Sequence, residues 1–239
     1  MNAPQTALLL IGSPKPKESS SESLGTYLFE ELETRGVRTQ TVKLVKALHS
    51  DEATEELRAA VAGSDLIVLS FPLYVDSLPA PAMLALERIS AWRADAAAET
   101  GEALAAGEGP VTGHRPAFVA ICQSGFPEVE QSEIAVEICR NFAATAGFEW
   151  AGGLILAAGG MVSGQPLRKI KGMMRSAARA LDLTADALAA GKPVPEKAVA
   201  LMAKPGFPRV AYRFMANWGW RSQLKKEAGG TPLDARPFA

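Results

Sequence analysis

Cysteine is scarce in this chain, and its scarcity excludes several classes of protein. Cys122 and Cys139 are the two cysteines among 239 residues, and they do not form a CxxC pair. A disulfide framework and a zinc or iron–sulfur site both need more thiols at closer spacing. The two histidines, His49 and His114, lie far apart, and no ligand spacing surrounds either of them. The sequence therefore predicts no metal centre.

Long apolar runs and an excess of one charge are also absent. No apolar segment approaches the roughly 20 residues that a membrane span requires. The first residues have neither the basic start nor the apolar core of a signal peptide, so we expect a cytoplasmic protein that does not enter the membrane. A formal net charge of −1 provides no field for recruiting nucleic acid. Hydrophobic residues make up 48% and charged residues 21%, which is typical of a globular protein.

Two glycine-rich nucleotide motifs are missing as well. Neither GxGxxG nor GxxxxGK[ST] occurs, so a dinucleotide-binding Rossmann site and a P-loop are disfavoured. The second predicted strand ends near Lys43 and Lys46, where a Rossmann site would carry an acid for the ribose 2′-hydroxyl.

What is present is an alternation of strand-length apolar runs with helical patterns. The runs end at glycine, proline or serine, whereas Leu24, Leu28 and Leu32 recur every four residues between glutamates. Residues 94–113 have no firm assignment, and one interpretation is a helix extension followed by a mobile loop. We expect strands at 7–11, 39–44, 65–71, 116–122 and 150–157, and helices at 21–35, 51–62, 82–92, 129–146 and 166–190.

This alternation predicts an α/β fold with a doubly wound parallel sheet that helices cover on both faces. The domain is expected to span residues 1–191. A proline-punctuated extension follows over 192–239, and its aromatic side chains are expected to pack on the domain or on a partner subunit, as in a homodimer. These aromatics are Phe207, Tyr212, Phe214, Trp218 and Trp220.

The loop after the first strand has the composition of a phosphate site. Residues 12–23 read GSPKPKESSSES and lead from a buried strand to a helix N-terminus. Unpaired backbone N–H groups and the helix dipole favour an anion there, and several hydroxyls add hydrogen-bond donors. The alternative is that the serines only cap the helix within a solvated loop.

The loops after the third and fourth strands reach the same edge of the sheet, where strand order reverses and ligands bind. In residues 71–81, Tyr74 offers a flat face, or else packs on the core beside a stiff turn. In residues 122–128, Gly125 permits close approach to a planar ligand, and Gln123 and Ser124 can donate hydrogen bonds. The alternative for this second loop is a plain strand-to-helix turn.

Four segments together resemble the NAD(P)H-dependent FMN reductase branch of the flavodoxin-like superfamily: GSPKPKESSS, SDLIVLSFPLYVDSLPAP, CQSGFPE and WAGGLILAAGG. The resemblance covers residues 7–164 and implies a flavodoxin-like five-stranded sheet of order 2-1-3-4-5. It also implies that the first loop binds the FMN phosphate and that the next two flank the flavin ring. The residues so implicated are Ser13, Lys15, Ser20, Ser21, Ser23, Pro72, Leu73, Tyr74, Ser124, Gly125 and Phe126.

The chain departs from the family pattern in three ways. Lys15 stands where the family usually has arginine, and the serine run is about one residue longer than usual. The cysteine cluster of the iron–sulfur flavoprotein relatives is missing, so that cofactor is not expected. The extension ending in WGWRSQLKKEAG is similar to some larger members of the family.

No set of catalytic acid, base and nucleophile emerges, which fits a flavoenzyme because the flavin carries the chemistry. The resemblance implies hydride transfer from NAD(P)H through bound FMN to a small-molecule acceptor such as a quinone, a nitro or azo compound, or free flavin. One alternative is an electron carrier or FMN-binding protein that oxidises no nicotinamide. Another is a flavodoxin-like scaffold without flavin. Replacing Ser21 or Ser23 with glutamate would place negative charge against the phosphate and weaken FMN retention.

A basic stripe on the expected helix at 166–190 allows two interpretations. It consists of Arg168, Lys171, Arg175 and Arg179, spaced three or four residues apart. Such a stripe could attract the 2′-phosphate of NADPH or an acidic partner. A solvated helix face has the same pattern.

Overall fold

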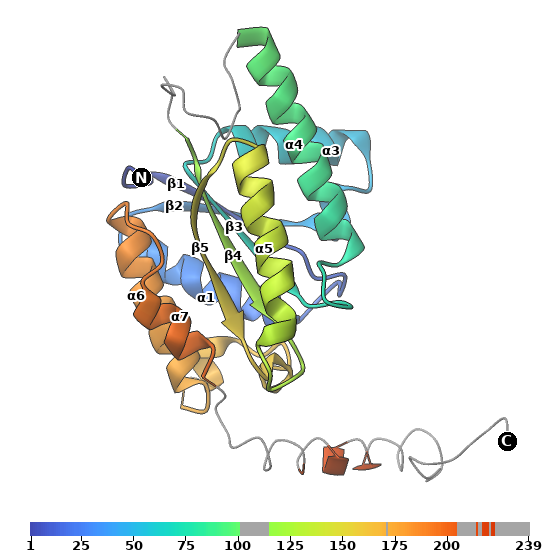
Figure 1. The fold of residues 1–239 in the computed structure, drawn as a ribbon, viewed down its shortest axis with the longest axis vertical. Coiled ribbons are helices and arrows are strands. Elements are labelled where there is room, and N and C mark those ends of the chain that lie inside the picture. Colours follow the sequence, from blue (N-terminus) through green and yellow to red (C-terminus); the bar gives the residue numbers. More distant parts are fainter. Residues whose placement is uncertain (101–114, 171, 205–213, 215–216, 220, 223–239) are drawn as a thin grey trace, which may run out of the picture. The chain divides into compact units, whose positions relative to one another are not determined.

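In the described part of the chain, five strands form one parallel sheet in the order β2-β1-β3-β4-β5 (Figure 1). This order confirms the flavodoxin-like fold. The computed structural model describes residues 1–100, 115–170, 172–204, 214, 217–219 and 221–222. The strands are β1 (Thr6–Ile11), β2 (Arg38–Lys43), β3 (Leu66–Pro72), β4 (Ala117–Gln123) and β5 (Glu149–Leu156).

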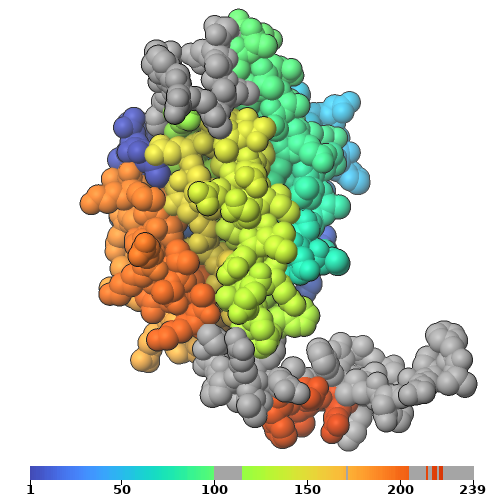
Figure 2. All heavy atoms as spheres, viewed as in Figure 1, coloured from blue at the N-terminus to red at the C-terminus, as the bar shows by residue number. Residues whose placement is uncertain are grey.

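Helices cover both faces of the sheet (Figure 1), and in the space-filling view of the same side these helices form much of the surface (Figure 2). One apolar layer joins α1, α6 and α7 to alternate strand side chains such as Leu9 and Ile11. The opposite layer joins α2, α3, α4 and α5 to Leu8 and Leu10. The helices are α1 (Ser20–Glu33), α2 (Leu44–Ala47), α3 (Asp51–Ala62), α4 (Ala80–Thr100), α5 (Glu130–Thr145), α6 (Arg175–Ala189) and α7 (Glu196–Met202).

The central strands are mainly apolar because both of their faces are covered. All seven residues of β3 are buried, and side chains that alternate along a strand enter opposite layers. Helix α1 packs close to β1, since a Cβ atom on Gly25 would lie 2.6 Å from Leu9 Cδ1. This close packing holds the N-terminus of α1 against the carboxyl end of β1.

The two edges of the sheet differ in how they are protected. Strand β2 forms one edge, and its sequence RTQTVK is polar and mostly exposed or half-buried. At the other edge, the N–H of Val194 donates to the carbonyl of Ala151 in β5 at 2.7 Å. Helix α7 follows at once, and its Ala198 and Met202 are fully buried in the layer with α1 and α6.

The predicted helix at 166–190 is wrong in its first part. Helix α6 begins at Arg175, and a short 3₁₀ helix, η2 (Leu167–Ile170), stands before it. Gly172 lies between the two and has low helix propensity, which favours the break. Arg168 therefore does not share a helix face with Arg175 and Arg179, and Lys171 lies outside the described residues.

The remaining differences concern the ends of segments. The compact unit runs from Met1 to Lys204, so α7 belongs to it although the sequence places the domain end at residue 191. Residues 205–239 form a second unit. Helix α4 continues to Thr100, beyond the predicted end at residue 92. Residues 101–114 and the aromatics Phe207, Tyr212 and Trp220 lie outside the described residues. No helix among the described residues has the length and apolarity to cross a lipid bilayer.

Candidate active site

Backbone hydrogen bonds join the three loops that the sequence singled out. The N–H of Gly12, after β1, donates to the carbonyl of Ser70 in β3 at 2.8 Å. The N–H of Leu73, after β3, donates to the carbonyl of Gln123 at the end of β4, also at 2.8 Å. The carboxyl ends of β1, β3 and β4 are thus one continuous edge, as the strand order requires.

A fourth segment completes this edge. Residues 158–170, which we call the strap, lead from β5 to η2 and include the 3₁₀ helix η1 (Gly159–Met161). The strap is tied to the β4 loop, because Gly159 N–H donates to Ser124 O and Ala158 N–H to Phe126 O, each at 2.7 Å. Its Gly164 lies so close to the first loop that a Cβ atom there would overlap the carbonyl oxygen of Glu18.

Strained backbone is concentrated at the same edge. Within the described ranges, every non-glycine residue with a positive φ lies in a loop that follows β1, β3 or β5. Such conformations cost about 1–3 kcal/mol each and cluster at functional sites in proteins. The residues are Glu18 (φ 54°), Val75 (φ 49°), Asp76 (φ 56°), Ala158 (φ 54°) and Ser163 (φ 48°).

Most serines of the first loop have local hydrogen-bond partners. Ser19 caps α1, since its hydroxyl oxygen accepts from the N–H of Glu22 at 3.0 Å. Ser23 Oγ donates to Ser19 O at 3.3 Å, and Ser13 Oγ accepts from Lys15 N–H at 3.3 Å. The capping alternative therefore describes Ser19, which the resemblance did not include. Which serine caps depends on where the helix starts, and the run of three serines left that open.

Ser21 differs from its neighbours. Its side chain is fully buried, and its hydroxyl oxygen has no hydrogen-bond partner among the described residues. Its carbonyl accepts from Ser70 Oγ in β3 at 2.7 Å, which fixes the residue at the carboxyl end of the sheet. The N–H groups of Ser20 and Ser21, in the first turn of α1, also have no acceptor in the described part of the chain.

The unpartnered donors of Ser20 and Ser21 show whether this end of α1 fits a phosphate ligand. An unsatisfied buried polar group costs about 1–3 kcal/mol, so one that stands beside unpaired N–H groups at a helix N-terminus points to a ligand that supplies the missing partner. One hydroxyl and two N–H groups at a helix N-terminus suit an acceptor with several oxygens and a negative charge. The residues present therefore fit the phosphate of FMN.

Nearby charges modulate this end of the site. Lys15 and Lys17 are exposed in the first loop. Glu22 is neutralised by Lys43, whose Nζ lies 2.6 Å from its carboxylate and also donates to the carbonyl of Pro16 at 3.3 Å. The lysine at the end of β2 thus cancels the acid in the first turn of α1.

The other predicted residues divide into framework and exposed surface. Pro72 ends β3 in the core, Leu73 is half-buried, and the buried Ser124 donates through Oγ to the carbonyl of Phe126 at 3.2 Å. Tyr74 is 47% exposed and Phe126 is 57% exposed, so Tyr74 does not pack in the core. A Cβ atom on Gly125 would meet nothing within 4 Å. Two exposed aromatic rings and an open glycine thus stand at the edge where a flavin ring is expected.

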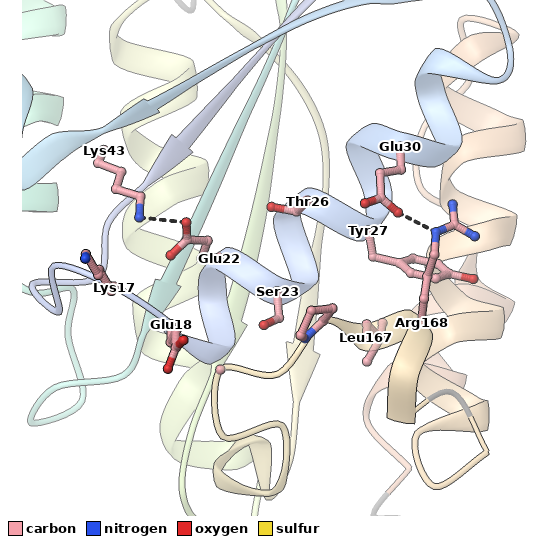
Figure 3. Close-up of a pocket in the computed structure, with 12 residues that line it drawn as sticks. Lys17, Glu18, Glu22, Ser23, Thr26, Tyr27, Glu30, Lys43, Leu167 and Arg168 are labelled. Atoms are coloured by element: carbon pink, nitrogen blue, oxygen red, sulfur yellow. Dashed lines mark hydrogen bonds and ion pairs between the residues drawn. The ribbon is translucent and has the colours of Figure 1, made fainter.

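A pocket of about 460 Å³ lies on the other side of the first loop, between α1, the end of β2 and the strap (Figure 3). Of the predicted residues, Ser23 lines it. Arg168, from the basic stripe, also lines it. No motif indicated the rest of the wall, although Ser23, Thr26, Tyr27 and Glu30 recur at helical spacing on one face of α1. The strap contributes Leu167 and Arg168.

The two thiols take no part in the site. Both cysteines are free and buried. Burial raises the pKa of the Cys122 thiol to about 12, and burial likewise raises the pKa of Cys139. Neutral buried thiols are poor nucleophiles. The described residues hold no group of three or more His, Cys, Asp or Glu side chains that could bind a metal ion.

The family model described as NADPH-dependent FMN reductase matches residues 6–132, more than half of the chain. The chain belongs to the NADPH-dependent FMN reductase family. This match spans β1 to the start of α5 and therefore contains all three predicted loops. It confirms the resemblance and the assignment as an FMN oxidoreductase that uses NAD(P)H. No curated protein sequence matches the chain.

Solved structures with the same fold are distant in sequence. A flavone reductase has a TM-score of 0.52 at 14% identity over 76% of this chain, which spans 62% of that protein. The NAD(P)H:quinone oxidoreductase from Methanothermobacter marburgensis has a TM-score of 0.51 at 17% identity over 74% of this chain and 96% of its own. An FMN-dependent NADH-azoreductase from Bacillus anthracis, solved with FMN, has a TM-score of 0.50 at 12% identity over 77% and 99%. Identities this low establish the fold alone.

Proposed function

We propose that this chain binds FMN across the carboxyl ends of β1, β3 and β4 and reduces a small-molecule acceptor with NAD(P)H. The acceptors that we propose are quinones, nitro or azo compounds and free flavin. The structures of a quinone oxidoreductase and an azoreductase share the fold, which supports quinones and azo compounds as acceptors. The observation that carries the proposal is the buried, unpartnered hydroxyl of Ser21 beside two unpaired N–H groups.

The residues divide the binding task between them. Ser20 and Ser21 would donate to the FMN phosphate through their N–H groups, and Ser21 also through its hydroxyl, while Lys15 supplies positive charge from the exposed loop. Tyr74 and Phe126 would flank the flavin ring, and Gly125 leaves room for the ring to approach the backbone. When bound, FMN supplies hydride acceptance and donation. The chain's own residues need only hold the ring and leave one face open to the nicotinamide.

The alternative of an electron carrier that oxidises no nicotinamide is tested directly. Purified protein loaded with FMN is mixed with NADPH, or with NADH, without oxygen, and the flavin absorbance is followed. We expect the yellow colour to bleach and to return when a quinone is added. A flavin that binds but stays oxidised in both cases would indicate the carrier, and protein that retains no FMN would indicate the scaffold.

The Ser21 observation gives a sharper test of the phosphate site. Ser21→Ala removes a hydroxyl that has no partner in the free protein, so the unliganded protein should be as stable as the wild type or slightly more stable. FMN affinity should fall by about tenfold to a hundredfold, since a hydrogen bond to a charged group contributes about 1.5–3 kcal/mol. The measurements are FMN titration by fluorescence quenching and urea unfolding without FMN.

Ser132→Ala is the matched control. Ser132 in α5 is also fully buried, and its hydroxyl interacts with the Cys122 thiol, but α5 lies on the opposite face of the sheet from α1. This variant should leave FMN affinity unchanged. If Ser21→Ala and Ser132→Ala bind FMN equally well, the phosphate does not sit at Ser21.

We further propose that the protein acts in the cytoplasm as a homodimer. Two free, buried thiols suit a reducing compartment. Exposed apolar side chains on or beside α4 and α5, namely Leu84, Phe126 and Ile134, suit burial against a second copy. Sedimentation velocity of the FMN-loaded protein tests the dimer, and a single species of monomer mass would contradict it.

A further inference from the structure

The pocket between α1 and the strap is separate from the edge that would hold the flavin ring. Tyr74, Gly125 and Phe126 do not line it, whereas Lys17, Glu18 and Ser23 of the first loop and α1 do. The first loop is therefore a shared wall. The volume of the pocket, about 460 Å³, lies within the range of small-molecule sites.

One end of this pocket is charged (Figure 3). Lys17, Glu18 and the ion pair of Lys43 with Glu22 stand there, beside the first turn of α1. The formal charges of these four side chains sum to zero and the helix dipole adds partial positive charge, so this end suits one negatively charged group rather than several. Over the whole pocket three cations face three carboxylates, which disfavours a polyphosphate.

The other end combines two buried apolar residues with a fixed planar cation. Leu167 and Tyr27 are buried there, and the Arg168 guanidinium lies 5.1 Å from the centroid of the Tyr27 ring. Arg168 pairs with Glu30 and donates to Glu31 Oε1 at 3.0 Å, so two carboxylates of α1 hold it in place. A guanidinium held in one orientation is a platform on which a flat heterocycle can stack.

Hydroxyls line the wall between the two ends. Ser23 and Thr26 lie one helical turn apart on the pocket face of α1. Their oxygens can exchange hydrogen bonds with the hydroxyls of a sugar. From one end to the other, the wall offers sites for an anion, a polyol and an aromatic heterocycle, in that order.

We propose that this pocket binds the adenosine 5′-monophosphate moiety of a nucleotide, with its phosphate near Lys17 and its adenine stacked on Arg168. Two sources carry this moiety: the adenylate half of FAD, taken in place of FMN, and the adenylate half of NAD(P)H. The pocket does not depend on the proposed FMN site, but the choice between its two sources rests on the proposed function.

The first test uses 5′-AMP itself and the full-length protein. Thr26 is exposed and lines the pocket, so Thr26→Phe fills the pocket without entering the core. Thr145→Phe makes the same change at an exposed position of α5, on the opposite face of the sheet. Calorimetry measures the affinity for AMP. We expect the wild type and Thr145→Phe to bind AMP with the same affinity, and Thr26→Phe to bind it at least about tenfold more weakly. ATP should bind more weakly than AMP.

The second test separates the sources, with binding as the readout. If the moiety arrives on FAD, wild-type protein binds FAD more tightly than FMN, and Thr26→Phe removes this preference while FMN affinity stays unchanged. If it arrives on the nicotinamide cofactor, Thr26→Phe protein loaded with FMN loses affinity for NADPH but not for reduced nicotinamide mononucleotide. Retained FMN affinity in Thr26→Phe shows that the flavin site is intact.

Two results would overturn the proposal. The first is no AMP binding to the wild type at millimolar concentration. The second is equal AMP binding by Thr26→Phe and Thr145→Phe. A wild type that binds AMP but not FMN would contradict the proposed function and leave the adenylate pocket standing.

Discussion

Gly164 shows how strictly one residue can be required at the site edge. Its φ is +72°, and a Cβ atom would overlap the carbonyl oxygen of Glu18. Because the obstacle is backbone, it cannot rotate away as a side chain would. The contact between the strap and the first loop therefore requires glycine.

Gly164→Ala should destabilise the protein by about 2 kcal/mol or more, from the unfavourable φ together with the forced separation of two loops. Gly160→Ala in the same strap should change stability by less than about 1 kcal/mol, since a Cβ atom there meets nothing within 4 Å. Urea unfolding measures both. Equal stabilities for the two variants would mean that the strap does not rest on Glu18.

The buried thiols give the protein a pH dependence at alkaline pH. Burial raises the pKa of Cys122 from 9.0 to about 12 and also raises the pKa of Cys139. Above pH 9 the unfolded chain loses these protons and the folded protein keeps them, so the free energy of unfolding falls as pH rises towards 12. The expected slope is about 1.4 kcal/mol per pH unit for each thiol.

Urea unfolding between pH 8 and about pH 10.5 measures this slope. Other groups titrate in the same range, so the comparison is with a Cys122→Ala, Cys139→Ala variant, which should lose stability less steeply with rising pH. Parallel profiles for the two proteins would contradict the burial argument.

At the residue scale, the sequence predicts which loop carries the donors but not which serine does what. A run of three serines at 19–21 fits several helix starts, and each start assigns a different residue to the cap. The structure assigns the cap to Ser19 and leaves the hydroxyl of Ser21 unpartnered. The close approach of Gly164 to Glu18 joins loops that are distant in sequence, so no local pattern indicates it.

Among the elements, strands were easier to predict than helix ends. Each predicted strand lies within one residue of the observed one at each end. The covered strands are apolar runs that stop at turn residues, and the edge strand β2 alternates polar and apolar residues. The segment at 166–190 has helical periodicity over its whole length, yet its first residues form the end of the strap, including η2. Contacts of Arg168 with Glu30 and Glu31 on α1 are available in that conformation, and they come from the tertiary structure rather than from local propensity.

Helix α7 illustrates an element that sequence reasoning left outside the domain. It is seven residues long, yet its Met202 is fully buried in the layer with α1 and α6. Met202→Ala should therefore cost about 2–5 kcal/mol in unfolding free energy. Val199→Ala in the same helix, where the side chain is 38% exposed, should cost less than about 1.5 kcal/mol. Similar small losses for both would show that α7 is not docked in solution.

On the scale of the whole molecule, the topology followed from the alternation of strands and helices. Right-handed crossovers between parallel strands leave few possible orders, and the family resemblance selected 2-1-3-4-5. The end of the compact unit could not be predicted in this way, because the prolines after residue 191 are typical of a linker. In the folded protein those residues carry Val194 to the open edge of β5.

Truncation tests where the compact unit ends. A chain ending at Lys204 should fold, bind FMN and unfold at nearly the same urea concentration as the full chain, because the unit from Met1 to Lys204 is retained whole. A chain ending at residue 191 lacks α7 and should lose about 3 kcal/mol or more, as its fully buried side chains are removed from the core. Circular dichroism during urea unfolding measures both, and equal midpoints would place the boundary at residue 191.

The protected edges of the sheet limit how copies of this protein can associate. An additional strand would have to pair with β2, whose polar side chains and Arg38 and Lys43 disfavour stacking against another chain, or with β5, where Val194 already uses a carbonyl of the ladder. Growth of a continuous intermolecular sheet, the route to fibrils, is disfavoured on both sides. Ordered assembly must then proceed through helix surfaces and loops, where contacts between side chains can specify a finite oligomer.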